Sequence, residues 1–420
     1  MHTLMTPVRN VAALLAVALL AAACGESTSA PGSGDAAAQG EGGTIRIGAA
    51  VALTGAVSRE GNLVKDGYEF WQEQVNEQGG IEVGGEGYEV EIVFYDDESD
   101  ADTGTRLTER LITQDNVQFL LGPYSSGITQ ATTTISERRG VLTIAPQANA
   151  DDIYERGYET VFSVLPPASS YLTGILDMAV ELDPEPETLA VMIRDDPFGI
   201  AAGQGAVRRA EELGMQVVFQ DRYPADATDV ASILTEVGRH DPDMLVASTL
   251  FQDSLLITRQ LKNLQMSPAL VGFTAGPALP DFIDSLSGDA HAVLGSEWWL
   301  PTLQYDGEET LGSTSEYAAA IEEEFGYTPG YHTASGSMAG LVLQLAIEQA
   351  GSLETEDIRA ALLDLEPETF WGPIGWNEEG KNVVGGSNPV QIMDDEVVAV
   401  WPEEAREQEP IYPFPAWNER

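Results

Sequence analysis

Two short polar turns carry the side chains best suited to chemistry in this chain of 420 residues. The first turn, Gly122–Gly127, leaves a predicted strand and begins a helix with Tyr124, Ser125 and Ser126. Unpaired backbone N–H groups at a helix start attract an anion, and a serine hydroxyl adds a donor. The turn therefore fits a site for a small carboxylate, but taken alone it favours a plain N-cap role for Ser125 or Ser126.

The second turn, Ala145–Ala150, follows the next predicted strand and contains Gln147, Ala148 and Asn149. Because neighbouring parallel strands end at the same edge of a sheet, we expect the two turns to lie side by side. Hydroxyl, amide and backbone groups would then converge, as they do in small-molecule binding sites.

Signatures of an enzyme are weak. Neither His240 nor His332 is placed as a catalytic base by its surroundings, and no G-x-S-x-G, P-loop or G-x-G-x-x-G motif follows a predicted strand. The acidic run Asp96–Asp102 has Ala101 and Leu107 where a calcium loop needs Gly and Glu. We therefore expect no enzymatic activity, no metal and no cofactor.

Strand and helix signals alternate in two long runs, one before and one after the Pro166-Pro167 break. Such repetition predicts an α/β protein with parallel sheets and right-handed crossovers, and two runs predict two doubly wound lobes. Helices and a late strand pair after Pro301 then require the chain to return, which predicts a multi-crossover hinge. The predicted parts are an N-terminal lobe of residues 44–164 plus 298–388, a C-terminal lobe of residues 165–297 plus 389–402, and a strap of residues 403–420.

The single cysteine, Cys24, predicts export and lipid anchorage. It follows the apolar run Val11–Ala23 behind Arg9, which is typical of a lipoprotein signal peptide over residues 1–23. An ordinary signal peptide with an incidental cysteine is the alternative. Residues 24–43 are rich in Ser, Gly, Ala and Glu, and predict a flexible tether.

The charge is strongly acidic. The 68 Asp and Glu residues against 20 Lys and Arg give a net charge of −48, which argues against nucleic acid and anionic lipid surfaces as partners. An acidic surface suits a saline habitat, and biased codon usage is the alternative explanation.

A family resemblance rests on seven short segments that occur in a fixed order between about residues 44 and 401. They are Leu53–Gly55, Asn76–Ile81, Asp96–Asp97, Gly122–Ser126, Ala145–Asn149, Tyr154–Gly157 and Phe370–Ile374. In order and spacing they resemble the type 1 periplasmic binding proteins of the leucine/isoleucine/valine-binding family. The resemblance implies two lobes that close around a ligand.

The same resemblance implies roles for particular residues. Ser125 would hold the ligand carboxylate through its hydroxyl and backbone N–H, and the turn of Gln147, Ala148 and Asn149 would contact the carboxylate and ammonium. Further residues implied for the cleft are Phe198 and Phe251 over the ligand side chain, Tyr124 and Tyr171 in the wall, and Trp298 or Trp299 at a crossover.

Two positions depart from the family pattern. Thr274 stands where amino-acid binders place an acid for the ammonium, and Glu60 or Arg59 stands where a first-lobe aromatic is usual. A buried ammonium without a partner would be costly. Candidate replacement acids are Asp195, Asp196, Asp253 and Glu297.

The expected function is that of an extracytoplasmic solute-binding lipoprotein of an ABC importer, anchored to the membrane at Cys24. It would deliver a small polar solute, with an amino acid favoured, to a membrane permease. Alternatives are a tethered ligand sensor, an exported hydrolase, or a binder of an amide, urea or aromatic acid.

Overall fold

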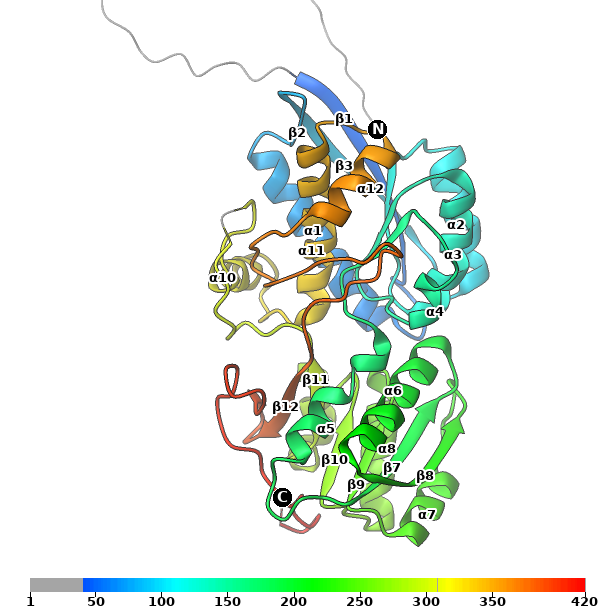
Figure 1. Ribbon diagram of the computed structural model, residues 1–420, viewed down its shortest axis with the longest axis vertical. Helices are drawn as coiled ribbons and strands as arrows, with labels where there is room; N and C mark the ends of the chain where they lie inside the picture. The colour runs from blue at the N-terminus through cyan, green and yellow to red at the C-terminus, as the bar shows by residue number, and fades with distance from the viewer. Residues whose placement is uncertain (1–40, 308, 420) are drawn as a thin grey trace, which may run out of the picture. The chain divides into compact units, whose positions relative to one another are not determined.

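The computed structural model describes residues 41–307 and 309–419, so the predicted signal peptide, Cys24 and most of the predicted tether lie outside the described residues. The described chain forms two sheets, each with helices on both faces (Figure 1). We call the six-stranded sheet with its helices the first lobe and the seven-stranded sheet with its helices the second lobe. The predicted α/β class is confirmed.

The first lobe has the strand order β2-β3-β1-β4-β5-β6, and all neighbours are parallel except β2 and β3. Its strands are β1 (Glu41–Val51), β2 (Ile81–Val83), β3 (Glu86–Asp96), β4 (Phe119–Leu121), β5 (Thr143–Ala145) and β6 (Val161–Ser163). Its helices are α1 (Ser58–Glu77), α2 (Ala101–Thr113), α3 (Ser126–Arg139), α4 (Asp151–Tyr154), α10 (Thr314–Phe325), α11 (Tyr331–Ala350) and α12 (Thr355–Asp364).

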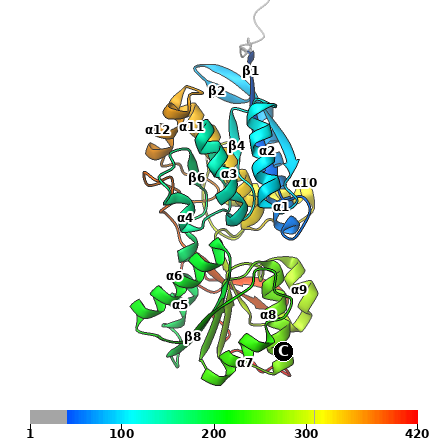
Figure 2. The ribbon, with the colours of Figure 1, turned by 90° about the vertical axis from the view of Figure 1, so that its right-hand side faces the viewer.

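Helices α1 and α11 pack together, whereas α2 and α3 pack on each other at the opposite face of the sheet (Figure 2). The α1–α11 contact is close because Gly67 and Gly336 face each other's backbone. A Cβ at Gly67 would lie 2.2 Å from the carbonyl oxygen of Thr333, and one at Gly336 would lie 2.5 Å from that of Val64. Glycine is therefore required at both positions.

The second lobe has the strand order β13-β12-β11-β10-β9-β7-β8, in which β7 to β11 are parallel and β12 and β13 antiparallel. Its strands are β7 (Thr188–Arg194), β8 (Gln216–Tyr223), β9 (Met244–Ala247), β10 (Leu270–Phe273), β11 (Leu294–Glu297), β12 (Asn388–Met393) and β13 (Glu396–Ala399). Its helices are α5 (Thr173–Ala179), α6 (Pro197–Leu213), α7 (Ala231–His240), α8 (Phe251–Leu264) and α9 (Pro280–Leu286), with short 3₁₀ turns at Ala168–Ser170 and Ser287–Ala290.

The chain passes between the lobes after β6, after β11 and before β12, which confirms the predicted multi-crossover hinge. Trp299, which follows β11, is fully buried and donates its indole N–H to the carbonyl oxygen of Phe370 at 3.0 Å. It therefore packs the first-lobe side of the hinge.

The late segments differ in part from expectation. Residues 372–380, between α12 and β12, are irregular, and one isolated β-bridge joins Trp376 to Asn382. The strap after residue 403 packs on the second lobe, where Phe414 N donates to Ala269 O at 2.7 Å and Trp417 Nε1 to Met266 O at 2.8 Å.

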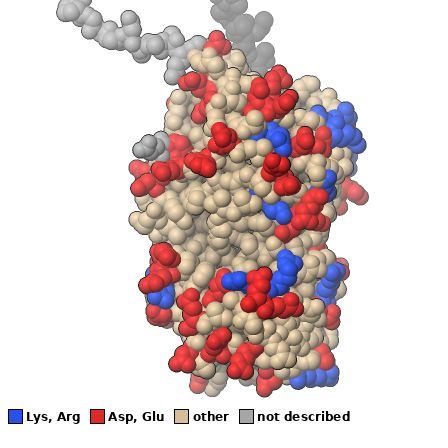
Figure 3. Space-filling model, in the orientation of Figure 1, with Lys and Arg blue, Asp and Glu red and all other residues tan. Residues whose placement is uncertain are grey.

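Acidic side chains are spread over both halves of one face of the molecule, with a largely uncharged belt between them (Figure 3). Of the helices that the structure describes, none combines the length and apolar character needed to cross a membrane.

Candidate functional site

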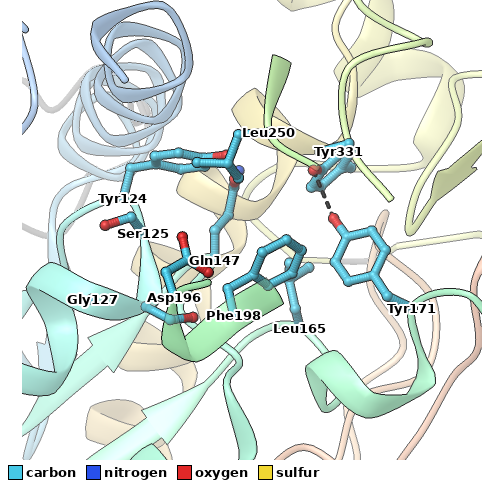
Figure 4. Close-up of a pocket in the computed structure, with 12 residues that line it drawn as sticks. Tyr124, Ser125, Gly127, Gln147, Leu165, Tyr171, Asp196, Phe198, Leu250 and Tyr331 are labelled. Atoms are coloured by element: carbon cyan, nitrogen blue, oxygen red, sulfur yellow. Dashed lines mark hydrogen bonds between the residues drawn. The ribbon is translucent and has the colours of Figure 1, made fainter. Parts of the chain in front are cut away.

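A small cavity lies between the two lobes, at the carboxyl ends of β4 and β5 (Figure 4). Its volume of about 30 Å³ gives room for about one water molecule. The lining residues are Tyr124, Ser125, Ser126, Gly127, Gln147 and Tyr331 from the first lobe, Tyr171, Asp196, Phe198, Leu250 and Ala275 from the second, and Leu165 at a crossing. Residues from both lobes thus enclose one space.

The two predicted turns are neighbours, as expected, because β4 and β5 pair in parallel. The backbone N–H of Ala150 donates to Ser126 Oγ at 3.1 Å, so that the serine hydroxyl links one turn to the other. Ser126 is buried, whereas Ser125 is half-buried beside it.

Ser125 has an unusual backbone. Its φ of 77° is positive, a region that side-chain-bearing residues rarely adopt and that costs of order 1–3 kcal/mol. Its hydroxyl caps α3 only loosely, since Ile128 N lies 3.4 Å from Ser125 Oγ. This weak cap leaves the hydroxyl available to a ligand at the start of a 14-residue helix.

Gln147 presents a carbonyl oxygen that has no hydrogen-bond partner among the described residues. Its amide nitrogen is fixed by bonds to His332 O at 3.1 Å and Ser335 Oγ at 2.8 Å, while Oε1 is buried and unpaired. A buried acceptor of this kind costs free energy until a donor reaches it. Because Gln147 lines the cavity, a ligand N–H or O–H group is a suitable donor.

Ala148 and Asn149 do not line the cavity. Ala148 is fully buried, and its carbonyl oxygen accepts from the Tyr154 hydroxyl at 2.5 Å. Asn149 donates through Nδ2 to Pro166 O at 2.7 Å, which ties the turn to the hinge. Both residues therefore stabilise the turn through hydrogen bonds without lining the cavity.

Aromatic rings form the opposite side of the cavity. Phe198 lies between Tyr124 and Gln147 on one side and Tyr171 and Tyr331 on the other (Figure 4). The ring of Tyr171 packs edge-to-face on Phe198, with centroids 5.3 Å apart. The Tyr171 hydroxyl donates to the Tyr331 hydroxyl at 2.7 Å, which joins the second lobe to α11 of the first.

The structure brings six of the ten predicted ligand-binding residues to the cavity, namely Tyr124, Ser125, Ser126, Gln147, Tyr171 and Phe198. Thr274 and Phe251 lie nearby in the second-lobe core. The Thr274 hydroxyl donates to Thr249 O and accepts from Thr249 N, both at 2.7 Å, so its hydrogen-bonding capacity is used within the fold.

Trp298 packs on Tyr171, which lines the cavity. Its indole packs edge-to-face on Tyr171 with centroids 4.9 Å apart, but Trp298 itself is absent from the lining. Sequence reasoning missed Leu165, Leu250, Ala275 and Tyr331. Of these, Tyr331 had a recognisable signal, since it follows Pro329-Gly330 and begins a helix.

Of the four candidate replacement acids, only Asp196 lines the cavity. Asp196 shares the Arg194 guanidinium with Asp253, at 2.6 Å from Nε and 2.5 Å from Nη1 respectively. Burial raises the pKa of Asp253, and the charge of Arg194 opposes that rise. The two carboxylates therefore already have a cation.

The other two candidates, Asp195 and Glu297, do not line the cavity. Asp195 forms an exposed ion pair with Arg222. Glu297 is 3% exposed, and its burial raises the pKa of the carboxyl well above the usual value. Burial lowers the pKa of His332 to about 3, because it disfavours the charged imidazolium, so His332 is neutral.

Glu60 lies where the first turn of α1 meets the second lobe. Its side chain is 3% exposed. Burial raises the pKa of Glu60 to about 7. Its neighbour Arg59 forms an ion pair with Asp281, again across the two lobes.

Comparison with known proteins places this geometry in context. Residues 44–396 match the model of a family described as "Periplasmic binding protein". Leu/Ile/Val-binding protein homolog 7 of Brucella suis is 24% identical over 94% of this chain and 97% of that protein.

Solved structures share the fold. The leucine-binding protein LivK of Thermotoga maritima has a TM-score of 0.74 at 20% identity, over 85% of this chain and 97% of that one. A Rhodopseudomonas palustris solute-binding protein of an ABC transporter, in complex with 3,4-dihydroxybenzoic acid, has a TM-score of 0.71 at 18% identity, over 90% and 99%. These matches confirm the resemblance predicted from the sequence motifs.

Proposed function

The chain belongs to the periplasmic binding protein family, and from this premise we propose that it captures a small solute between its lobes for delivery to the permease of an ABC importer. The family name indicates an extracytoplasmic location. Membership in a solute-binding family also agrees with the expectation that the chain is not an enzyme.

The observation that carries this proposal is the composition of the cavity between the lobes. The first lobe supplies hydroxyl and backbone donors at Ser125 and an unpaired acceptor at Gln147, whereas the second supplies the apolar face of Phe198. A ligand with a carboxylate, an N–H donor and an apolar side chain matches these three features. An amino acid has all of them, and the names of the Brucella relatives point the same way.

An aromatic acid is the second candidate solute. Thr274 replaces the acid expected at its position, and one structural relative was solved with 3,4-dihydroxybenzoic acid. Such a ligand would use Ser125 for its carboxylate and Phe198 for its ring, and a hydroxyl group would donate to Gln147.

Capture requires the lobes to separate. A cavity of about 30 Å³ is far smaller than the 300–1,000 Å³, roughly, of ordinary ligand sites. The ligand would therefore enter an open form and stabilise a closed one, through its greater affinity for the closed arrangement. Residues 44–164 with 298–388, and 165–297 with 389–402, would be the moving bodies.

Attachment to the membrane through a lipid on Cys24 belongs to the same proposal. Support comes from the sequence before Cys24 and the polar segment after it. Metabolic labelling of the expressed protein with palmitate, compared with a Cys24→Ala variant, tests the anchor; equal labelling of both would refute it.

Thermal unfolding of the purified protein in the presence of single solutes tests the proposed function. The panel contains the twenty common amino acids, urea, short amides and aromatic acids. A ligand at 100 times its Kd adds roughly 2.7 kcal/mol to the free energy of unfolding. Stabilisation by one chemical class is expected, and a cooperative transition that no member shifts would contradict the proposal.

A further inference from the structure

A second cavity, which we call the hinge cavity, lies beside the segments by which the chain crosses between the lobes. Its lining includes Pro166 after β6, Trp298 after β11 and Ser387 before β12. Its volume of about 330 Å³ falls within the range of roughly 300–1,000 Å³ that is usual for small-molecule sites. It shares no lining residue with the cavity at the ends of β4 and β5, so it is a separate site.

Aromatic residues dominate the wall of the hinge cavity. They are Trp298, Tyr305, Trp371 and Trp401. Three of the seven tryptophans of the chain therefore meet at one place. Tyr305 and Trp371 come from the first lobe, whereas Trp401 follows β13 of the second. Walls of this composition suit apolar groups, other rings and organic cations.

The aromatic wall is held in place by the fold around it. Gly372 has a φ of 92°, and a Cβ there would lie 2.7 Å from two ring atoms of Tyr305, so the Tyr305 ring rests directly on the Gly372 backbone. Trp298 and Trp371 are each 5% exposed. A wall that is already ordered before a ligand arrives lowers the entropic cost of binding.

The surroundings of the hinge cavity are acidic. Its own described lining contains no charged residue, and an adjoining cavity of about 580 Å³ shares three lining residues with it. The charged residues in the described lining of that adjoining cavity are Asp306, Glu366 and Glu368. At the second-lobe side, Trp401 donates its indole N–H to Glu181 Oε1 at 3.2 Å. Carboxylates near both ends repel an anionic ligand and attract a cation.

We propose that the hinge cavity binds a small organic cation that carries a methylated ammonium group. Such a group has methyl groups on its surface and a positive charge, and aromatic cages attract it through the quadrupoles of their rings. Its nitrogen donates no hydrogen bond, so a lining without charged acceptors leaves none of its groups unsatisfied. A primary ammonium has three donors and is a poorer match. This site is additional to the proposed function and does not depend on it.

The experiment titrates the purified protein with choline and with 3,3-dimethylbutanol, in which carbon replaces the nitrogen, so that shape is kept and charge is lost. Tyr305→Leu and Trp401→Leu each remove one ring at a half-buried position, one from each lobe. Trp417→Leu is the matched control. The Trp417 indole also donates a hydrogen bond, to Met266 O at 2.8 Å, but Trp417 does not line the hinge cavity.

The wild type should bind one choline per chain, at least about tenfold more tightly than the uncharged alcohol. Removal of either ring should weaken choline by about twofold to thirtyfold, as expected for one cation–π contact, and should bring the two affinities closer together. Added salt should weaken choline and leave the alcohol unchanged, because the acids of the adjoining cavity are exposed. Trp417→Leu should change none of these values.

No binding of choline to the wild type, or equal affinities for choline and the alcohol, would overturn the proposal, and this comparison holds even if a variant fails to fold. Wild-type affinity for choline in both ring variants would also overturn it. Neither Tyr305 nor Trp401 lines the cavity between the lobes, so the cation would then be bound elsewhere. Sedimentation with phosphatidylcholine vesicles that choline reverses would contradict a free cation as the ligand, since the same group would then be taken from a lipid.

Discussion

At the scale of single residues, the cavity contains two side chains whose arrangement costs free energy in the absence of a ligand. Ser125 adopts a strained backbone with φ of 77° and caps its helix through a contact of 3.4 Å. Gln147 buries an unpaired oxygen. Strain and unsatisfied polar atoms of this kind are concentrated at binding sites, where the ligand supplies the missing partner.

Ser125→Ala should weaken binding of the carboxylate ligand by at least tenfold and lower the free energy of unfolding by about 0.5–2 kcal/mol, as loss of an N-cap does. Titration calorimetry and urea unfolding measure the two effects. Ser313→Ala is the control, since Ser313 caps α10 in a capping box with Glu316 and lies outside the cavity lining. It should lower stability alone, and unchanged affinity in Ser125→Ala would show that Ser125 is a structural cap only.

At the scale of elements, strand ends and helix starts position the site. Arg194 ends β7, Asp196 caps α6 with Gly199 N at 2.7 Å, and Asp253 accepts Leu250 N at 2.8 Å in the first turn of α8. One guanidinium thus holds the starts of two helices against one strand end. These two helix starts position Phe198, in the first turn of α6, and Leu250, at the N-cap of α8, and both residues line the cavity.

Arg194→Met should therefore destabilise the protein by about 3–5 kcal/mol, because it leaves two largely buried carboxylates without a cation. Urea unfolding at pH 7 measures the loss, with Arg222→Met as the control. The Arg222–Asp195 pair is about half exposed on both sides, so its removal should change stability by about 1 kcal/mol or less. Equal effects of the two substitutions would refute this role for Arg194.

The elements themselves were largely predictable. Alternating strand and helix signals predicted the two α/β runs and the return of the chain between the lobes. Strands β2 and β6, of three residues each, were not predicted. The turns of Ser125 and Gln147 were predictable because strand order fixes which turns are neighbours.

Other parts of the site could not be predicted. Which acids have a cation depends on contacts between residues far apart in the chain, such as Arg194 with Asp253 and Arg59 with Asp281. Thr274 stays a predicted ligand position, and its hydroxyl is bonded to Thr249 in this structure. No local pattern distinguishes these arrangements from exposed ones.

At the scale of the whole molecule, closure depends on contacts that form only when the lobes are together. These contacts are the Arg59–Asp281 ion pair and the Tyr171–Tyr331 hydrogen bond. Each favours the closed form over the open form. Loss of the Arg59–Asp281 ion pair, which lies outside the cavity lining, should therefore weaken ligand binding without removing a contact to the ligand.

Asp281→Asn should weaken the affinity for the ligand by up to about fivefold at low salt, since an exposed ion pair contributes about 0–1 kcal/mol. The effect should fall as salt is raised, because ions screen exposed charges. Asp289→Asn removes an ion pair with Lys262 within the second lobe and should leave affinity unchanged. A salt-independent loss, or an equal loss in both variants, would contradict closure through Asp281.

We propose that the lobes close on a solute whose carboxylate is held at the start of α3. Titration calorimetry of the purified protein, with the amino acid that stabilises it most and with the amine that lacks only the carboxylate, tests this claim most directly. We predict one ligand per chain for the amino acid and an affinity at least 100-fold weaker for the amine. Equal binding of the two would show that the site does not recognise a carboxylate, and the assignment of Ser125 and its turn would be wrong.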